Sequence, residues 1–208
     1  MGKASRRRAD HRARASVSHG PLSIRPLAAD DLPAALELLA GTVDTLTPET
    51  AALYLAPPTE NNSFARGLVA ETEDSITGIA LAIGKAIHLP GLPVDTATMV
   101  RRLVWLDAVA VHPAARRRGV GTGLINATLD SYRADGYRLV CANLATGRHD
   151  LPPIYTAWGW TVGRAGAGLP LHLGGYDIEI NAHPEVRTAW QALDAGVRVE
   201  RGVVTGVV

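Results

Sequence analysis

The stretch VHPAARRRGVGTGL, residues 111–124, constrains the fold of this chain more than any other segment. It follows an apolar run, LVWLDAVAV, which predicts a β-strand that ends at Pro113. It precedes LINATLDSYRADG, whose apolar residues have helical spacing. The alternating glycines between them let the backbone turn sharply and let a ligand approach it closely. The segment therefore predicts a strand, a short turn and a helix whose first amides can bind an anion.

Two common nucleotide-binding loops are excluded by the residues present. A GxxxxGK[ST] loop needs a lysine after its glycines, and none follows here. The dinucleotide fingerprint GxGxxG needs a glycine where Leu124 stands, and no acidic residue lies about 20 positions further on. Three arginines directly before the glycines add groups suited to phosphate. The simpler alternative is a loosened helix start on a basic, solvated surface.

The spacing Arg116-x-x-Gly119-x-Gly121 resembles the Q/R-x-x-G-x-G/A signature of the GNAT (Gcn5-related N-acetyltransferase) superfamily. LDAVAVHPAAR, just before it, resembles the fourth strand of that family. The resemblance covers roughly residues 21–180 and implies that the turn binds the pyrophosphate of acetyl-coenzyme A. It also implies that the pantetheine arm pairs with the fourth strand, in a groove made where the fourth and fifth strands splay. The coenzyme-binding residues it implies are Val109, Ala110, Val111, Arg116, Arg117, Arg118, Gly119, Val120, Gly121, Thr122, Gly123, Asn143 and Tyr155.

A second element of the family resemblance is LPPIYTAWGWTV, which is similar to the motif A-x-x-x-Y-x-x-x-G-F. Tyr155 takes the place of its tyrosine, and its phenol is expected to protonate the departing thiolate as a general acid. The alternative is a tyrosine that packs its ring and bonds backbone through its hydroxyl. Asn143 lies further before Tyr155 than is usual in the family, with the loop LATGRHDLPP between them.

Acylation of an amine also needs a base, because an alkyl ammonium must first lose a proton. Asp107 is the carboxylate of the predicted fourth strand, where some family members carry a catalytic acid. Period two would place Trp105, Asp107, Val109 and Val111 on one face, unless a bulge intervenes. The alternative for Asp107 is an ion pair with a neighbouring arginine or a bond to a loop amide.

Other candidate residues have structural interpretations beside the functional ones. Glu71 and Glu73 flank a predicted hairpin turn, and His172 is a candidate for the acceptor pocket. His112 precedes Pro113 and is expected to be structural. Cys141, the one cysteine, lies in an apolar run and is expected to be a buried small hydrophobe. No cluster has metal-ligand spacing, so no metal is expected.

Composition places the chain among ordinary globular proteins, with 208 residues of which 47% are hydrophobic. Residues 1–20 hold six Lys or Arg and one Asp, which leaves 15 of the 21 basic and 19 of the 20 acidic residues to the remainder. That remainder has a balance of −4, which does not favour nucleic acid. No apolar stretch of about 18 residues predicts a membrane span, and the cysteine content is typical of a cytoplasmic protein.

The order of predicted elements favours an α/β fold: a mixed, mostly antiparallel GNAT-like sheet with splayed fourth and fifth strands and helices on both faces. We expect a disordered basic tail at 1–20, an acetyltransferase domain at 21–182 and a C-terminal extension at 183–208. In that extension HPEVRTAWQALDAG predicts a helix, followed by a strand or a loose tail. Its apolar residues could form a homodimer interface or fold back on their own sheet. LHLGGYDIEI predicts a single strand.

The expected function is transfer of an acetyl group from acetyl-coenzyme A to a primary amine, by direct attack in a ternary complex. A backbone amide near Val109 would hold the oxyanion, Tyr155 would be the acid and Asp107 the base. Use of a larger acyl group, acylation of a hydroxyl and a non-catalytic coenzyme A-binding module are the alternatives. The mildly acidic remainder is compatible with a cationic acceptor, such as a polyamine-like molecule, an antibiotic or a peptide N-terminus; no motif identifies the acceptor.

Overall fold

The computed structural model describes residues 22–40, 47–55, 64–72, 75–84, 103–173 and 175–207. The basic tail expected at 1–20, the turn residue Glu73 and the loop at 85–102 lie outside the described residues. None of the helices in the described part of the chain has the length and apolar character that a membrane span requires.

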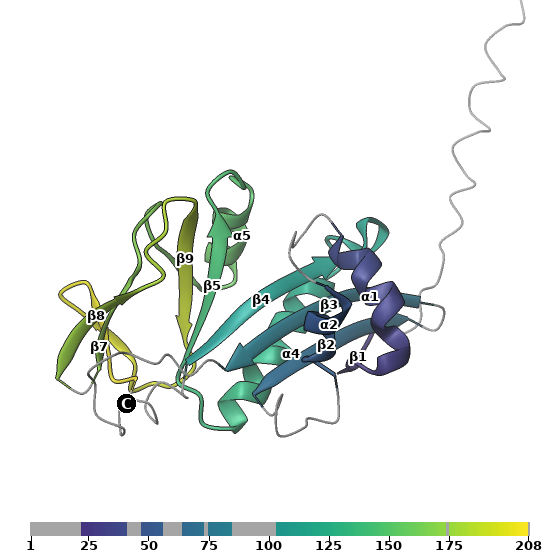
Figure 1. Cartoon of the computed structure of the whole chain (residues 1–208), viewed down its shortest axis with the longest axis horizontal. Helices are drawn as coiled ribbons and strands as arrows, with labels where there is room; N and C mark the ends of the chain where they lie inside the picture. Colours follow the sequence, from purple (N-terminus) through teal and green to yellow (C-terminus); the bar gives the residue numbers. More distant parts are fainter. Residues whose placement is uncertain are drawn as a thin grey trace, which may run out of the picture.

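A seven-stranded mixed sheet forms the centre of the molecule (Figure 1). All neighbouring strands are antiparallel except the fourth and fifth, which are parallel. The predicted mixed and mostly antiparallel sheet is thus confirmed. In spatial order the strands are β1 (Ser23–Pro26), β2 (Ala65–Thr72), β3 (Ser75–Gly84), β4 (Leu103–Val111), β5 (Leu139–Ala145), β9 (Val186–Ala192) and β6 (Thr161–Val162).

Helices cover both faces of this sheet. The 3-10 turn η1 (Ala29–Asp31) leads into α1 (Leu32–Leu39), which packs on β3 and β4, and α2 (Pro48–Ala52) contacts α1. The Thr47 side chain caps α2, where it accepts a hydrogen bond from the Thr50 amide (3.2 Å). On the opposite face α4 (Val120–Ala134) packs on β2, β3 and β4, and the short α5 (Leu151–Ala157) contacts β6.

Close packing of α4 on the sheet depends on Gly78 of β3. A Cβ atom there would lie 2.9 Å from side-chain atoms of both Val120 and Leu124, nearer than real Cβ contacts come. The glycine therefore brings the start of α4 against the sheet, at the end where β4 finishes. The 3-10 turn η2 (Pro113–Ala115) connects β4 to that helix start.

β4 contains a bulge at Asp107. Leu81 of β3 pairs with Ala108, while Ala82 pairs with Leu106, so Asp107 has no partner on β3. One extra residue shifts the alternation of side chains by one position.

The bulge changes which side chains of β4 share a face. Trp105 packs in the cluster beneath the second sheet, and Asp107 accepts a hydrogen bond from Tyr54, which follows α2. Val109 and Val111 instead pack in the cluster beneath α4. The prediction that Trp105, Asp107, Val109 and Val111 share one face is therefore wrong, because the extra residue reverses the parity halfway along the strand.

A second, four-stranded sheet packs on the far part of the central sheet. LHLGGYDIEI forms a hairpin within it rather than the single strand predicted, since the chain reverses between Leu173 and Tyr176. Leu171 and Val204 from this sheet pack with Cys141 of β5 in one buried cluster. In spatial order its strands are β10 (Arg198–Glu200), β11 (Val203–Thr205), β7 (Leu169–Leu173) and β8 (Tyr176–Ile180).

The helix predicted within residues 183–196 is wrong, because this segment contains strand β9. The antiparallel ladder between β5 and β9 begins where Leu139 faces Ala192 and ends where Ala145 faces Val186. On its other side β9 pairs with β6. Pairing with strands on both sides outweighs the helix propensity of the Ala and Gln residues of β9. β9 is thus a strand of the central sheet and β10 and β11 belong to the second sheet, so the described part of this segment is not an appended element beyond a boundary at 182.

Most apolar residues of this C-terminal segment fold back on the chain's own sheets. Leu193 and Val197 are buried, and Trp190 packs against the cluster between the two sheets. Val199 on the edge strand β10 stays 51% exposed.

Candidate functional site

β4 and β5 are paired only at their beginnings. The parallel ladder begins where Leu103 faces Leu139 and ends where Leu106 faces Ala142. Beyond it β4 pairs with β3 alone. β5 continues along β9 instead. Figure 1 shows the two strands diverging toward α5. The predicted splay is therefore confirmed, and it leaves one edge of β4 unpaired after Leu106.

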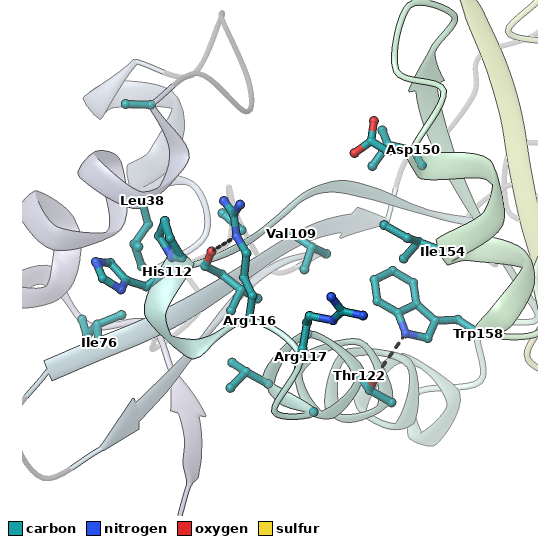
Figure 2. A pocket seen from close by; sticks show the side chains of 18 of the residues that line it. Leu38, Ile76, Val109, His112, Arg116, Arg117, Thr122, Asp150, Ile154 and Trp158 are labelled. Carbon is teal, nitrogen blue, oxygen red and sulfur yellow. Dashed lines mark hydrogen bonds between the residues drawn. The ribbon is translucent and has the colours of Figure 1, made fainter. Parts of the chain in front are cut away.

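The backbone of Val109 faces this opening. The His112 amide donates to the Thr77 carbonyl (2.9 Å), on the β3 side. Successive residues of a strand direct their N–H and C=O groups to alternate sides, so Val111 and Val109 direct theirs away from β3. The Arg116 Nε donates to the Val111 carbonyl (3.1 Å; Figure 2). Val109 has no pairing partner on β5 among the described residues, so its N–H and C=O are open to a ligand.

The glycine turn adopts the conformation of an anion-binding helix start. Gly119 is the N-cap of α4 and has φ 84°, a left-handed conformation that suits glycine, and Arg117 before it has φ 61°. The first hydrogen bond of the helix runs from the Gly123 amide to the Gly119 carbonyl (2.8 Å). The amides at 120–122 therefore have no partner within the helix, and the helix dipole adds positive potential there.

A pocket of about 1120 Å³ joins this helix start to the end of β4 and to α5. Its other side is made by residues of α1 and by the beginning of β3, including Glu37 and Ser75. Ten of the residues that the sequence predicted for the coenzyme line it: Val109, Ala110, Val111, Arg116, Arg117, Gly119, Val120, Gly121, Thr122 and Tyr155.

Three residues predicted for the coenzyme do not line this pocket. Gly123 faces β1, since a Cβ there would lie 3.1 Å from the Ile24 side chain. Asn143 accepts a hydrogen bond from the Asn181 side-chain amide (3.1 Å) on the paired part of β5. Arg118 is exposed and outside the lining.

Tyr155 lies on α5 and lines the pocket, but its ring is buried. The ring packs edge-on between Trp158 and Trp160, with centroids 5.3 and 5.1 Å away. Burial raises the pKa of Tyr155 to about 12, because the phenolate would lose its hydration. The phenol therefore keeps its proton at neutral pH and can donate it to a group in the pocket.

Asp107 lies at the bulge, outside the lining of the pocket. The hydroxyl of Tyr54 donates to one of its carboxylate oxygens (2.7 Å). Tyr54 is buried, and burial together with the nearby Asp107 charge raises the pKa of Tyr54. The tyrosine thus remains a hydrogen-bond donor that fixes this carboxylate beside the point where β4 leaves β5.

A family model described as an acetyltransferase (GNAT) domain matches residues 23–163, which include the whole pocket-forming segment. The chain belongs to the GNAT acetyltransferase family.

Solved GNAT structures share the fold of this chain at low sequence identity. The PaiA N-acetyltransferase from Thermoplasma acidophilum, in complex with coenzyme A, has a TM-score of 0.58 and 12% identity, over 83% of this chain and 99% of that one. YncA from Salmonella typhimurium, with its cofactor acetyl-CoA, has a TM-score of 0.54 and 20% identity, over 84% of this chain and 95% of that one. The ribosomal-protein-S18-alanine N-acetyltransferase from Escherichia coli has a TM-score of 0.54 and 15% identity, over 83% of this chain and 94% of that one. A search of curated protein sequences returns no match.

The remaining predicted candidates lie at two kinds of place in this GNAT fold. His112 lines the pocket, where its Nδ1 accepts from the Ala114 amide (3.3 Å). Glu71 pairs with Arg25 (2.7 Å) at the far edge of the sheet, and His172 pairs with Asp177 (2.7 Å) in the second sheet. These last two lie outside the pocket lining.

Cys141 is fully buried, and this burial raises the pKa of its thiol, as expected for a small hydrophobe. Within the described ranges, no group of three or more His, Cys, Asp or Glu side chains is arranged to hold a metal ion.

On α5 and the loop before it, sequence reasoning identified Tyr155 but missed the other residues that line the pocket. Arg148, Asp150, Ile154 and Trp158 line the pocket there. Arg148 holds Asp150 by two hydrogen bonds (2.9 Å each), which lower the pKa of that carboxyl to about 2. The helical spacing of residues 151, 154, 155 and 158 was a signal that could have grouped them on one face.

Proposed function

We propose that this GNAT domain transfers an acetyl group from acetyl-coenzyme A to a primary amine of a small molecule or peptide. One observation carries the proposal. A single pocket joins the free amides at the start of α4, the unpaired edge of β4 and the protonated phenol of Tyr155. An anion site, an extended arm site and a proton donor are the three features that a phosphorylated thioester needs from its enzyme.

The residues of the pocket fit the phosphorylated end of such a donor. A Cβ on Gly121 would lie 3.5 Å from Val111 Cγ2 and 3.7 Å from Trp158 Cζ2, so a side chain there would fill the space between them. Glycine keeps this passage open beside the free amides. Arg116 and Arg117 add positive charge at the rim of the same space. Acetyl-coenzyme A would supply an activated thioester carbonyl for the amine to attack.

Two groups of the chain would act on the thioester. The Val109 N–H, open on the β5 side, would stabilise the negative charge that develops on the carbonyl oxygen. Tyr155 would give its proton to the sulfur as the carbon–sulfur bond breaks, since its raised pKa keeps that proton available. The ring contacts with Trp158 and Trp160 hold the phenol in place for this step.

Asp107 would accept the proton of the amine, through a water molecule. It lies two residues before Val109 on the strand that borders the opening, and it faces the α1–α2 side rather than the α4 side. Amine and thioester would then approach the opening from opposite faces of the sheet. Asp107 and the exposed Glu37 give the α1–α2 side a negative character, which supports a cationic acceptor.

A panel of amines tests this function. Purified protein is incubated with acetyl-coenzyme A and, in turn, polyamines, amino-sugar antibiotics and short peptides with free N-termini, and thiol release is followed. We expect turnover with at least one cationic amine and none with matched neutral alcohols. Tight binding of acetyl-coenzyme A without turnover on any amine would instead indicate a coenzyme A-binding module. Faster turnover with longer acyl donors would reassign the acyl group.

A further inference from the structure

α5 and α4 are joined by one side-chain hydrogen bond at the edge of the pocket. The indole Nε1 of Trp158, the residue that ends α5, donates to Oγ1 of Thr122 in the first turn of α4 (3.1 Å; Figure 2). Both side chains line the pocket. The bond therefore connects the wall that carries Tyr155 to the helix start whose amides are free.

This bond determines where the proton of the Thr122 hydroxyl goes. An indole N–H is only a donor, so the Thr122 oxygen must be the acceptor, and its own proton must find another partner. The usual partner in a helix is the carbonyl three or four residues earlier, and Ser131 of α4 donates to the Thr128 carbonyl in this way (3.0 Å). Thr128 of the same helix follows this rule and donates to the Leu124 carbonyl (2.8 Å).

The Thr122 hydroxyl forms no such hydrogen bond to a helix carbonyl in the described structure. The carbonyl four positions earlier belongs to Arg118, which precedes the helix, and the carbonyl three positions earlier, that of Gly119, accepts from the Gly123 amide. Within the described residues, Thr122 Oγ1 forms a side-chain hydrogen bond with Trp158 and none with either carbonyl. Thr122 is exposed to the pocket, beside the free amides at 120–122. Its proton is therefore available to an acceptor that enters the same space as those amides.

The same indole also touches the proposed acid. The rings of Trp158 and Tyr155 meet edge to face, with centroids 5.3 Å apart. Trp158 therefore contacts both the Thr122 hydroxyl at the anion site and the phenol on α5. A displacement of the indole would move both groups together.

We infer that Trp158 is a positioning residue which turns the Thr122 hydroxyl into a donor for a phosphate of the acyl donor and ties the helix that carries Tyr155 to that phosphate site. The identity of the phosphate-bearing ligand as coenzyme A rests on the proposed function. The hydrogen-bond geometry itself does not.

Binding of coenzyme A and of pantetheine, measured by calorimetry without any acceptor, tests the hydroxyl. Pantetheine has the same thiol arm and no phosphate. We expect Thr122→Val to weaken coenzyme A binding about tenfold, as loss of one hydrogen bond to a charged group does, and to leave pantetheine binding unchanged. Thr122→Ser should bind coenzyme A within about twofold of the wild type, because it keeps the hydroxyl. Equal binding by Thr122→Val, equal losses for both ligands, or a serine variant as weak as valine would overturn the inference.

Trp158→Phe tests the indole, since it keeps a ring against Tyr155 and removes the donor N–H. We expect a loss of coenzyme A affinity of about threefold, and no further loss when this change is added to Thr122→Val, because both act on one hydrogen bond. Additive losses in the double variant would contradict the coupling. Far-ultraviolet circular dichroism verifies folding, and the Thr122→Val comparison stands alone if the phenylalanine variant does not fold. These measurements need no turnover, so inactivity with every amine leaves their outcome readable.

Discussion

The wall of the pocket formed by α4 and the wall formed by α1 differ in the polar groups that they present to the pocket. The α4 wall presents backbone amides and arginines around Gly119 and Gly121, and its main parts lie within one continuous segment, 109–122. The α1 wall presents mostly apolar side chains and one carboxylate, Glu37, with Asp107 beyond it. Backbone amides hold a ligand common to many proteins, whereas side chains distinguish one ligand from another. The proposed function assigns donor binding to the first wall and acceptor choice to the second.

The largest expected effect concerns the proton donor on the donor side. Tyr155→Phe should lower kcat about 100-fold or more, because the leaving sulfur loses its general acid. Since burial raises the pKa of Tyr155 to about 12, the phenol is protonated throughout the neutral range, and wild-type activity should not fall through its ionisation below pH 10. Steady-state rates at saturating acetyl-coenzyme A between pH 6 and 10 measure both. Tyr176→Phe, at an exposed position of β8, is the matched control; full activity in the Tyr155 variant would remove the acid from this wall.

The next effect addresses the other wall. Asp107→Asn should lower kcat/KM about 30-fold at neutral pH, because the amide cannot accept a proton from the amine. Its affinity for coenzyme A should stay unchanged, since Asp107 lies outside the pocket lining. Amine titrations and coenzyme binding measure the two halves of this prediction, with Asp177→Asn in the second sheet as control. A loss of coenzyme affinity in place of rate would place Asp107 with the donor wall and weaken the distinction drawn here.

A third change narrows the passage at the donor wall. Gly121→Val should raise the KM for acetyl-coenzyme A about tenfold, because the added methyl groups fill the space between Val111 and Trp158. The KM for the amine should change little. Gly147→Val is the control, since no atom lies within 4 Å of a Cβ at that position. An effect on the amine alone would show that the acceptor, rather than the donor, uses this passage.

The smallest expected effect separates two adjacent arginines. Arg117→Gln should weaken coenzyme A binding about fivefold at low salt and less at high salt, as an exposed ion pair does. Arg118→Gln should bind as the wild type, because Arg118 lies outside the pocket lining. Calorimetry at two salt concentrations compares them. Equal losses of coenzyme A affinity in both variants would mean that the arginines attract the ligand through their overall positive charge and that Arg117 makes no specific contact with it.

The α4 wall could be predicted from sequence because its parts are local. The strand end, the arginines and the glycines follow one another in VHPAARRRGVGTGL, and their spacing indicates both the backbone shape and the ligand class. The splay of β4 and β5 was also expected, as an implication of the family resemblance. The family resemblance rested chiefly on the same stretch, whereas the mixed sheet followed from the order of the predicted elements along the chain.

The remaining features depend on contacts between segments distant in sequence. VRTAWQA has residues compatible with a helix, and only its pairing with β5 and β6 makes it a strand. Alternation in Val186, Thr188 and Trp190 was the available signal for that strand. The bond between Trp158 and Thr122 joins positions 36 apart, and the α1 wall is assembled from short elements that carry no motif. Tertiary pairing, which local patterns do not encode, decides each of these.

The bulge in β4 makes Asp107 an extra residue that has no pairing partner on β3. Ala108 and Leu106 face consecutive residues of β3, as they would in a regular ladder without Asp107. The two halves of the strand therefore stay in register with β3, while the alternation of side chains between the two faces is reversed after the extra residue. A change of side chain at this position therefore leaves the pairing of β4 with β3 intact and removes only the hydrogen bond that Tyr54 donates to Asp107.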